Sequence, residues 1–391
     1  MKILQVYPYF YPAWSYGGVT RVAYEISRRL ADRGHEVTIY ATDALDNKSR
    51  VTKNTNPTYI DGMKVYYFKN LSNYLTYKHH IPLPLGMPFR IKEEVKKFDV
   101  IHLHGYPHSL NVLVHYYAKK YGVPYVLQAH GAVLPFFQKQ RLKKIFDIFF
   151  GYKMLRDASK VIASTKIEAG QYKKMDVDED KIEIVPNGID LSEYDNLPER
   201  GEFRRKYSIR DDEKIILYLG RIHKIKGIDL LVDAFAELIK VMDNVKLAIV
   251  GPDDGFLSTI KKQIEDLKVG DKILLTGRIP EKDKLGAYVD ADVYVLPSVY
   301  ETFPISVLEA CACGTPIIVT DRCGIANIVN NNVGYVVKYN KNPLQDTIFK
   351  ILTNVELRRY FGEGGKKLVR EKFSWDIVVE QLEKIYGDVK G

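Results

Sequence analysis

The chain has 391 residues, of which 46% are hydrophobic and 27% are charged, and its formal net charge is +9 at pH 7. This is a globular composition, and at about 150 residues per domain the length predicts two or three domains. We see no apolar span long enough for a bilayer and no secretory signal at Met1, so we expect a cytoplasmic protein. Only three cysteines occur, which argues against a disulfide framework. The positive charge favours an anionic partner without selecting one.

Strand and helix signals alternate along the chain, which indicates β-α units and largely parallel sheets. The predicted strands of the first half are residues 2–6, 36–40, 64–68, 99–103, 124–128, 161–163 and 182–185. The pattern starts again after residue 200, with strands at 214–219, 245–250, 272–275, 292–296, 316–320 and 334–337. Residues 189–212 are polar and form the candidate linker.

These patterns predict an α/β protein with two doubly wound Rossmann-like lobes, residues 1–195 and 205–373. Ligands of such sheets bind beyond the carboxyl ends of the strands. We therefore expect the site in a crevice between the lobes.

A pair of glycines, Gly17 and Gly18, follows the first strand and opens a helix that ends near Gly34. Because glycine has no Cβ, the pair lets the backbone approach a donor phosphate or an acceptor closely; the alternative is a simple turn. Its place at the carboxyl end of a strand favours binding. The spacing differs from Gly-x-Gly-x-x-Gly, which argues against a nicotinamide-dependent oxidoreductase.

Four histidines lie in or near predicted strands of the first half. His102 and His104 share one strand face, and with His108 they raise the question of a zinc site. No thiolate or carboxylate set accompanies them, so we favour a role in lining the acceptor side of the crevice. His130, in the run Gln-Ala-His-Gly, directly follows a strand, where a neutral imidazole can hydrogen-bond a hydroxyl; the alternative is a structural histidine with partners inside the fold.

Residues 134–153 combine an apolar stripe with a cationic face at helical spacing. The stripe consists of Leu142, Ile145, Phe146, Phe149 and Phe150. Two interpretations stay open: the helix lies on an anionic membrane surface, or the stripe packs against the core while the lysines face solvent. We slightly favour core packing, because amphipathic helices commonly pack so in α/β lobes. No nucleic-acid-binding motif accompanies the charge, so no nucleic-acid partner is expected.

The run GRIHKIKG, residues 220–227, joins a strand to a helix that begins near Ile228. Its cations, Arg221 and Lys226, therefore belong to a strand-to-helix loop facing the crevice. A sugar nucleotide leaves a diphosphate when its anomeric bond breaks, and two cations can stabilise that charge without a metal. The alternative is a solvated basic turn.

A short helix is predicted after the strand 292–296. Pro304 suits its first position and Gly314 a stop, so Thr302 or Phe303 should cap it. Its first turn leaves N–H groups unpaired, which suits a phosphate or sugar hydroxyls.

Two carboxylates, Glu301 and Glu309, stand eight positions apart around this helix start. A carboxylate accepts hydrogen bonds from two vicinal hydroxyls at once. Glu309 is therefore suited to the ribose and Glu301 to the transferred sugar; the alternative is an ordinary helix with one solvated acid.

This Glu-x7-Glu segment resembles the signature of retaining glycosyltransferases of family 4, which have the GT-B fold. The resemblance extends over nearly the whole chain through the glycine loop at 17–21, QAHG at 128–131, VPNGID at 185–190 and the loop 220–227. The chain departs from the family pattern at Pro304, where the family often has glycine, and at CGIAN, residues 323–327, which replaces Gly-Gly-x-x-Glu.

The resemblance implies a nucleotide diphosphate sugar as donor substrate and no further cofactor. It implies catalytic roles for Glu301, His130, Arg221 and Lys226. It implies that the donor is also bound by Gly17, Gly18, Arg278, Ile279, Thr302, Phe303, Pro304, Ile305 and Glu309, with Arg278 and Ile279 bordering the base through backbone groups. It further implies that the final helix, residues 374–391, packs on the first lobe.

No metal is expected. Asp290-Ala291-Asp292 and Asp178-Glu179-Asp180 match an Asp-x-Asp motif only superficially, because short acids before strands commonly end helices or build turns. Retention is implied by the resemblance, and no nucleophile and acid/base pair is identifiable in the sequence. The hypothesis is a same-face substitution in which the leaving phosphate helps to deprotonate the acceptor.

We therefore predict a metal-independent hexosyltransferase that acts on a hydroxyl of a saccharide or lipid-linked glycan in cell-surface polysaccharide or glycoconjugate synthesis. It would be cytoplasmic, and peripheral at the inner membrane face if residues 134–153 bind lipid. The alternatives are a sugar-nucleotide epimerase or phosphorylase of the same fold, a non-catalytic sugar-nucleotide-binding protein, and a nicotinamide oxidoreductase.

Overall fold

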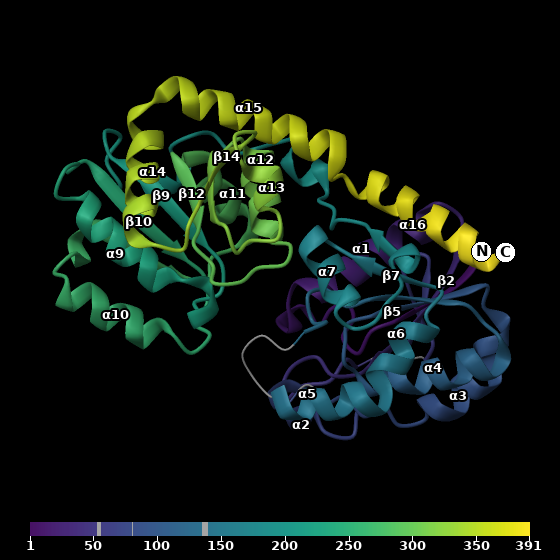
Figure 1. The fold of residues 1–391 in the computed structure, drawn as a ribbon. Helices are drawn as coiled ribbons and strands as arrows, with labels where there is room; N and C mark the ends of the chain where they lie inside the picture. The colour runs from purple at the N-terminus through teal and green to yellow at the C-terminus, as the bar shows by residue number, and fades with distance from the viewer. Residues whose placement is uncertain (53–55, 80, 135–139) are drawn as a thin grey trace. The chain divides into compact units, whose positions relative to one another are not determined.

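The computed structural model describes residues 1–52, 56–79, 81–134 and 140–391, and it divides into two compact units. Unit 1 comprises Met1–Gly188 and Trp375–Gly391, and unit 2 comprises Ile189–Ser374. Each unit contains one sheet packed against helices (Figure 1). The two units are Rossmann-like, as the alternating strand and helix signals predict.

Unit 1 has an eight-stranded sheet in the order β3-β4-β2-β1-β5-β6-β7-β8. The strands are β1 (Lys2–Val6), β2 (Glu36–Thr42), β3 (Thr58–Ile60), β4 (Met63–Phe68), β5 (Val100–His104), β6 (Tyr125–Gln128), β7 (Lys160–Ala163) and β8 (Ile182–Ile184). All neighbours are parallel except β3 and β4. The order reverses between β1 and β5, so their carboxyl ends form the topological switch point at which α/β sheets bind ligands.

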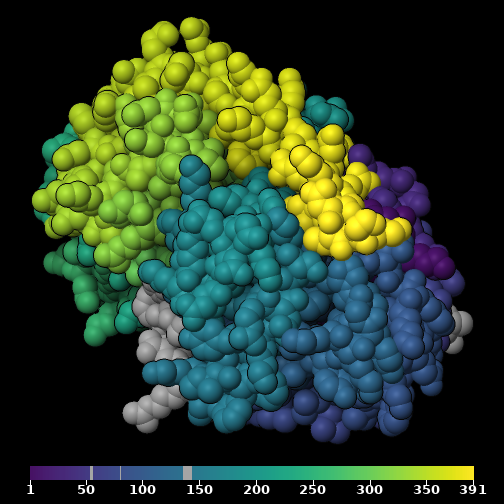
Figure 2. All heavy atoms as spheres, turned by 45° about the vertical axis from the view of Figure 1, so that its right-hand side comes forward, coloured from purple at the N-terminus to yellow at the C-terminus, as the bar shows by residue number. Residues whose placement is uncertain are grey.

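The helices of unit 1 include one from the end of the chain. They are α1 (Gly18–Asp32), α2 (Asn73–His79), α3 (Met87–Glu94), α4 (Ser109–Tyr121), α5 (Gln140–Phe146), α6 (Tyr152–Asp157), α7 (Lys166–Lys173) and α16 (Trp375–Lys390). Figure 2 shows α16 in yellow against the purple atoms of the N-terminal segment. Glu383 of α16 pairs with Arg33 at 2.8 Å, and Lys390 pairs with Asp99 at 3.2 Å.

Unit 2 has a six-stranded parallel sheet in the order β11-β10-β9-β12-β13-β14. The strands are β9 (Lys214–Leu219), β10 (Val245–Val250), β11 (Ile273–Gly277), β12 (Val293–Leu296), β13 (Ile317–Thr320) and β14 (Gly334–Val337). The helices are α8 (Glu202–Lys206), α9 (Ile228–Leu238), α10 (Leu257–Asp266), α11 (Glu281–Asp290), α12 (Ile305–Cys313), α13 (Ala326–Val329), α14 (Lys341–Thr353) and α15 (Val355–Lys372). Here the switch point lies between β9 and β12.

The polar stretch expected to be a linker belongs to unit 2 and contains α8. The Asp290 carboxylate accepts hydrogen bonds from the backbone N–H groups of Gly201 and Arg204, and Asp292 pairs with the Arg204 side chain at 3.4 Å. These acids therefore anchor the stretch to the sheet through long-range contacts, which the predicted role in ending helices or building turns does not account for.

The observed strands agree with the predicted ones to within about two residues at each end, but one observed strand and one helix cap differ from the prediction. The edge strand β3 was not predicted, because its three residues are too few to show an alternating pattern. The predicted cap of α12 is wrong: Pro304 takes the N-cap position with an extended ψ of 113°, and the Thr302 hydroxyl donates to Tyr300 instead.

Apolar side chains fill both units, and the three cysteines, Cys311, Cys313 and Cys323, are free and buried in unit 2. Within the described ranges no helix combines the length and the apolarity that a membrane crossing requires.

Candidate functional site

The loops that follow β9 and β12 meet at the switch point of unit 2. The backbone N–H of Val299 donates to the carbonyl of Ile225 at 2.9 Å, and Lys226 forms an ion pair with Glu301. Both side chains are largely shielded, with exposed fractions of 16% and 19%. The structure therefore brings together two of the four predicted catalytic residues, although 75 positions separate them in the sequence.

Two glycines make this close approach of loops sterically feasible. Gly227 has φ +65°, and a Cβ there would lie 2.1 Å from the carbonyl oxygen of Pro297. Gly251, with φ +145°, would place a Cβ 1.9 Å from the oxygen of Gly220. Any side chain at these positions would push the loops apart, so glycine is required on steric grounds as well as for its positive φ.

Arg221 lies in the same loop as Lys226 but has a different partner. Its guanidinium pairs with Asp254, in the loop after β10, at 2.6 Å, and 62% of the side chain is exposed. The backbone N–H of Ile222 also donates to Pro252. The second predicted diphosphate cation is thus solvent-accessible and paired with an exposed acid.

The start of α12 lies next to the Glu301 loop. Its N-cap, Pro304, provides no side-chain hydrogen bond, and the Val307 N–H donates to the Pro304 carbonyl at 3.2 Å, so among the described residues no side chain caps the helix start. Tyr294 of β12 donates to Ser306 at 2.8 Å and fixes the first turn against the sheet. Phe303 is buried in the core of unit 2 and Ile305 is half-buried.

Glu309, the second carboxylate of the motif, lies inside unit 2. One of its oxygens pairs with Lys284 of α11 at 2.8 Å, and the other accepts from the Tyr288 hydroxyl at 2.9 Å. Burial opposes the charge of Lys284, but Glu309 and Glu281 outweigh it and raise the lysine pKa. Glu309 is therefore held as one half of a buried ion pair, and its assignment to the ribose stays a prediction.

Arg278 and Ile279 directly follow β11, so they lie at the carboxyl ends of the strands of unit 2, as the loops after β9 and β12 do. Arg278 is exposed and Ile279 is half-buried against the core. The carbonyl of the preceding Gly277 accepts from the backbone N–H of Gly251, which joins this loop to the one after β10.

In unit 1, Gly17 and Gly18 are exposed between a short 3₁₀ turn and α1. Gly17 has φ +98°, and a Cβ at either glycine would have no neighbour within 4 Å. The pair therefore leaves open space at the amino end of α1, next to the end of β1.

His130 follows β6 in a tight turn. Its φ of +54° is unusual for a residue with a Cβ, and Gly131 continues the turn with φ +84°. The turn is held by the buried Glu168, which accepts from the Gly131 N–H, and by the Tyr172 hydroxyl, to which the Ala129 N–H donates at 2.9 Å. These contacts compensate a backbone strain of about 1 kcal/mol or more.

The imidazole ring of His130 packs against the imidazole ring of His104. Nε2 of His130 is 3.1 Å from Nδ1 of His104, and His104 stacks on His102 with centroids 3.9 Å apart. Burial, with a smaller effect from His108, lowers the pKa of His130 to about 3. Burial and the neighbouring rings also hold the pKa values of His102 and His104 well below 6.5. All three imidazoles are therefore neutral at ordinary pH.

These histidines do not form a zinc cage. Within the described parts of the chain, no group of three or more His, Cys, Asp or Glu side chains is arranged to hold a metal ion. Nδ1 of His104 lies 3.1 Å from Nε2 of His130, and Nδ1 of His102 lies 2.6 Å from the hydroxyl of Tyr386.

The basic segment is described in part, because residues 135–139 of the predicted 134–153 helix lie outside the described residues. Phe146 packs against the core of unit 1, but Ile145, Phe149 and Phe150 are 45–65% exposed. The preference for core packing was therefore wrong for these three residues. Phe149 and Phe150 lie in a π-helical turn, Asp147–Gly151, which changes the register of the helix after Phe146, and Ile148 in the same turn also faces solvent.

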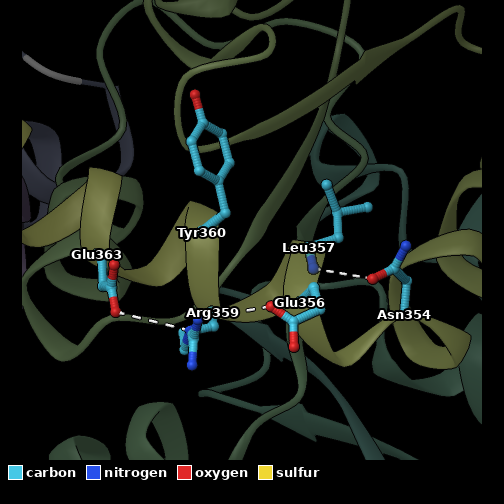
Figure 3. A pocket seen from close by; sticks show the side chains of 6 residues that line it. All are labelled: Asn354, Glu356, Leu357, Arg359, Tyr360 and Glu363. Carbon is cyan, nitrogen blue, oxygen red and sulfur yellow. Dashed lines mark hydrogen bonds and ion pairs between the residues drawn. The ribbon is translucent and has the colours of Figure 1, made fainter.

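A separate surface recess of about 420 Å³ lies along α15. Figure 3 shows Arg359 between Glu356 and Glu363, with ion-pair distances of 3.5 and 4.0 Å, and Tyr360 pointing away from them. The recess contains none of the predicted site residues, and its charges satisfy one another.

Three residues that support the site were missed from the sequence: Gln5, Glu168 and Tyr386. All three are buried, and Gln5 is a polar residue within the apolar strand Lys2–Val6. A polar residue in such a position was the available signal, since buried polar groups require partners.

Two Rossmann-like units, with predicted site residues at the switch point of each, define a GT-B-type enzyme. Residues 16–193 match the family model described as Glycosyltransferase Family 4, and residues 199–368 match that described as Glycosyl transferases group 1. The chain belongs to the family 4 type of GT-B glycosyltransferases, and it is an enzyme of that class.

Full-length relatives and solved structures agree with this membership. The chain is 28% identical to an uncharacterized glycosyltransferase of Methanocaldococcus jannaschii, over 99% of the chain and 98% of the relative. It is 27% identical to an N-acetyl-alpha-D-glucosaminyl L-malate synthase of Bacillus anthracis, over 96% and 95%. The fold is shared with sucrose-phosphate synthase of Thermosynechococcus elongatus (TM-score 0.75, 20% identity, 99% of both chains) and with HepE of Anabaena in complex with UDP and glucose (0.77, 16%, 99% and 100%).

Proposed function

We propose that the enzyme transfers a hexose from a nucleotide diphosphate sugar to a hydroxyl of a saccharide or lipid-linked glycan, with retention of anomeric configuration and without a metal, in cell-surface glycan synthesis. The observation that carries the proposal is the Lys226–Glu301 pair beside the uncapped start of α12. This arrangement offers a cation and free N–H groups to a diphosphate, and a carboxylate to a sugar hydroxyl. The solved Anabaena relatives contain UDP and UDP-glucose, which supports the donor class.

In this proposal Lys226 and Arg221 neutralise the diphosphate as the anomeric bond breaks. Lys226 exchanges its Glu301 partner for a phosphate oxygen, and Glu301 turns to a hydroxyl of the transferred sugar. Neutral His130 accepts or donates a hydrogen bond at that sugar, since burial prevents its protonation. The backbone N–H groups of Thr302, Phe303 and Ile305, before and at the start of α12, receive the second phosphate, and Gly17 and Gly18 leave room for substrate.

The test is a donor screen followed by a matched pair of variants. Diphosphate sugars of uridine, guanosine and adenosine are compared by thermal shift, since a ligand at 100 times its Kd adds about 2.7 kcal/mol of stability. Lys226→Met should lower kcat at least about 100-fold with the donor so found. Lys224→Met, an exposed lysine of the same loop, should leave kcat unchanged. Equal effects of the two substitutions would contradict the proposal.

Stereochemistry and metal use need separate measurements. We expect the product anomer to match the donor in NMR spectra, and activity to survive an excess of EDTA. A stable sugar adduct on Glu301 after trapping would refute the same-face substitution. An epimerase would convert the donor without an acceptor, and a phosphorylase would require inorganic phosphate.

A second proposal concerns an anionic membrane. Ile145, Ile148, Phe149 and Phe150 are exposed together, flanked by the exposed Lys144 and Lys153. Buried Asp147 accepts from the Tyr106 hydroxyl and pairs with Lys143 at 2.7 Å, so the turn that carries these side chains is anchored. Such a combination of apolar and basic side chains suits the interface of an acidic bilayer.

Liposome flotation tests this surface. We expect binding to acidic but not to neutral vesicles, weakened by salt, and lost in the variant Phe149→Ser, Phe150→Ser. The control is Phe89→Ser, which removes a 74% exposed phenylalanine from α3. Flotation that is independent of acidic lipid, or equal loss with the control, would exclude the proposed surface.

A further inference from the structure

We propose that Gln5 of β1 and His104 of β5 are positioning residues that hold His130 in its Nε2–H tautomer. In this form the Nδ1 lone pair of His130 accepts a hydrogen bond, so the enzyme recognises a hydroxyl donor on its substrate there. The inference rests on the role of His130 under Proposed function, and it adds what fixes the direction of that hydrogen bond.

The three side chains form one line of hydrogen bonds. Nε2 of His130 is 3.1 Å from Nδ1 of His104, and Nε2 of His104 is 2.6 Å from the amide oxygen of Gln5. The two imidazole rings are nearly parallel, at 10°. Gln5 and His104 are fully buried, so water does not substitute for these partners.

The direction of the line follows from the chemistry of the amide. Oε1 of Gln5 only accepts, so Nε2 of His104 carries the proton. A neutral imidazole has one N–H, which leaves Nδ1 of His104 as the acceptor for Nε2–H of His130. By the same rule Nδ1 of His130 is an acceptor, and it is buried without a hydrogen-bond partner in the described structure.

The amide of Gln5 is oriented from its other end. Its Nε2 lies 3.4 Å from the hydroxyl of Tyr386, on α16, and that hydroxyl lies 2.6 Å from Nδ1 of His102. Burial raises the pKa of Tyr386, so the residue stays a phenol. Reversing Gln5 would place an N–H on Nδ1 of His130, and a buried donor without a partner is rarer in proteins than an unpaired acceptor.

Because the three rings are neutral, the line of hydrogen bonds determines the tautomer of each histidine and not its charge. The pKa values of all three histidines lie far below 6.5, because His102 and His104 are buried and the half-buried His130 packs against them. The line therefore fixes which nitrogen holds the proton, as an outer partner does for a metal-bound histidine.

The experiment uses the full chain with ¹⁵N-labelled histidine and no ligand. Long-range proton–nitrogen spectra distinguish a protonated from an unprotonated ring nitrogen, and comparison with His130→Asn assigns the signals. We expect Nε2 protonated and Nδ1 unprotonated in the wild type. Gln5→Met should give a mixture of tautomers. Tyr386→Phe, which removes only the partner of the Gln5 amide nitrogen and keeps the Gln5–His104 bond, should change the tautomer less than Gln5→Met does.

Activity provides the second readout. Gln5→Met should lower kcat about 10-fold and change the donor KM less than about 2-fold, since it alters alignment and not donor contacts. A wild-type spectrum with the proton on Nδ1 of His130 would overturn the proposal whatever Gln5→Met and Tyr386→Phe show. An unchanged tautomer and kcat in Gln5→Met would do so as well. Full activity of His130→Ala would instead refute the role of His130 under Proposed function, and the tautomer measurement does not depend on it.

Discussion

Lowering the pH from about 7.5 to about 5.5 should destabilise unit 1 through its buried histidines. His102, His104 and His130 stay neutral in the folded protein, whereas in the unfolded chain each takes up a proton near its ordinary pKa of 6.5. A group whose pKa is depressed by folding is neutral in both states above about pH 6.5, and its penalty on the folded state grows as the pH falls below that value. For one histidine the penalty at about pH 5.5 is about 1.4 kcal/mol, so three give about 4 kcal/mol.

The two tryptophans of the chain make this unit directly observable. Trp14 and Trp375 both belong to unit 1, so tryptophan fluorescence in a urea titration follows its unfolding. The free energy of unfolding is measured at each pH, and the fitted m-value checks that the same transition is followed.

A histidine substitution separates the contribution of the histidines to the pH dependence of stability from that of other titrating groups. Burial raises the pKa of Glu168, which acts in the opposite direction, but its contribution cancels between wild type and variant. His104→Gln should lose about 1.4 kcal/mol less than the wild type over the same pH step. The control, His79→Gln, removes a histidine outside the stack. If His104→Gln and the wild type lose equal stability, the three imidazoles are not held neutral and the reasoning fails.

Two further outcomes follow from the packing of unit 2. Burial raises the pKa values of Cys313 and Cys323 to about 12, so neither thiol should react with a maleimide in the native protein, and both should react in urea; a rapid native reaction would contradict their burial. Gly227→Ala should lower the free energy of unfolding by about 2 kcal/mol more than Gly255→Ala, because both glycines have positive φ but only Gly227 would clash with the carbonyl of Pro297. Equal losses in urea titrations would show that the loop relaxes at no cost.

Much of the fold could be predicted because buried parallel strands appear as short apolar runs between turn residues. The strands 214–219 and 245–250 were placed correctly to the residue for this reason. Strand order carries no such signal, since it depends on how crossover helices pack. Lys226 and Glu301 come together because β9 and β12 are neighbours in the strand order of unit 2.

The partners of Glu309 show the same limit at the level of a side chain. Its position inside α12 follows from the sequence, but Lys284 and Tyr288 lie on α11, more than twenty positions earlier. No periodicity relates two helices that meet only after both have packed on the sheet. The sequence therefore could not show that both oxygens of Glu309 have partners within unit 2, and its assignment to the ribose stays a prediction.

The histidine stack shows what becomes predictable once strand register is known. Alternation correctly placed His102 and His104 on one face of β5, but their chemistry depends on the strand beside it. Gln5 of β1 is in register with His102, and residues in register on parallel neighbours point to the same face. A polar residue in the first strand thus supplies the acceptor that turns two candidate metal ligands into a hydrogen-bonded support for His130.

The pairing of Lys226 with Glu301 bears on how a donor would bind. In the ligand-free enzyme each charge already has a partner, so a diphosphate must replace a carboxylate and not a shell of water around Lys226. The net gain in binding is then small, because one ion pair is exchanged for another. The gain grows as the leaving diphosphate acquires charge, while the released carboxylate stays available to the sugar. Such a pair would contribute more to the transition state than to the ground state, which is the condition for accelerating the chemical step.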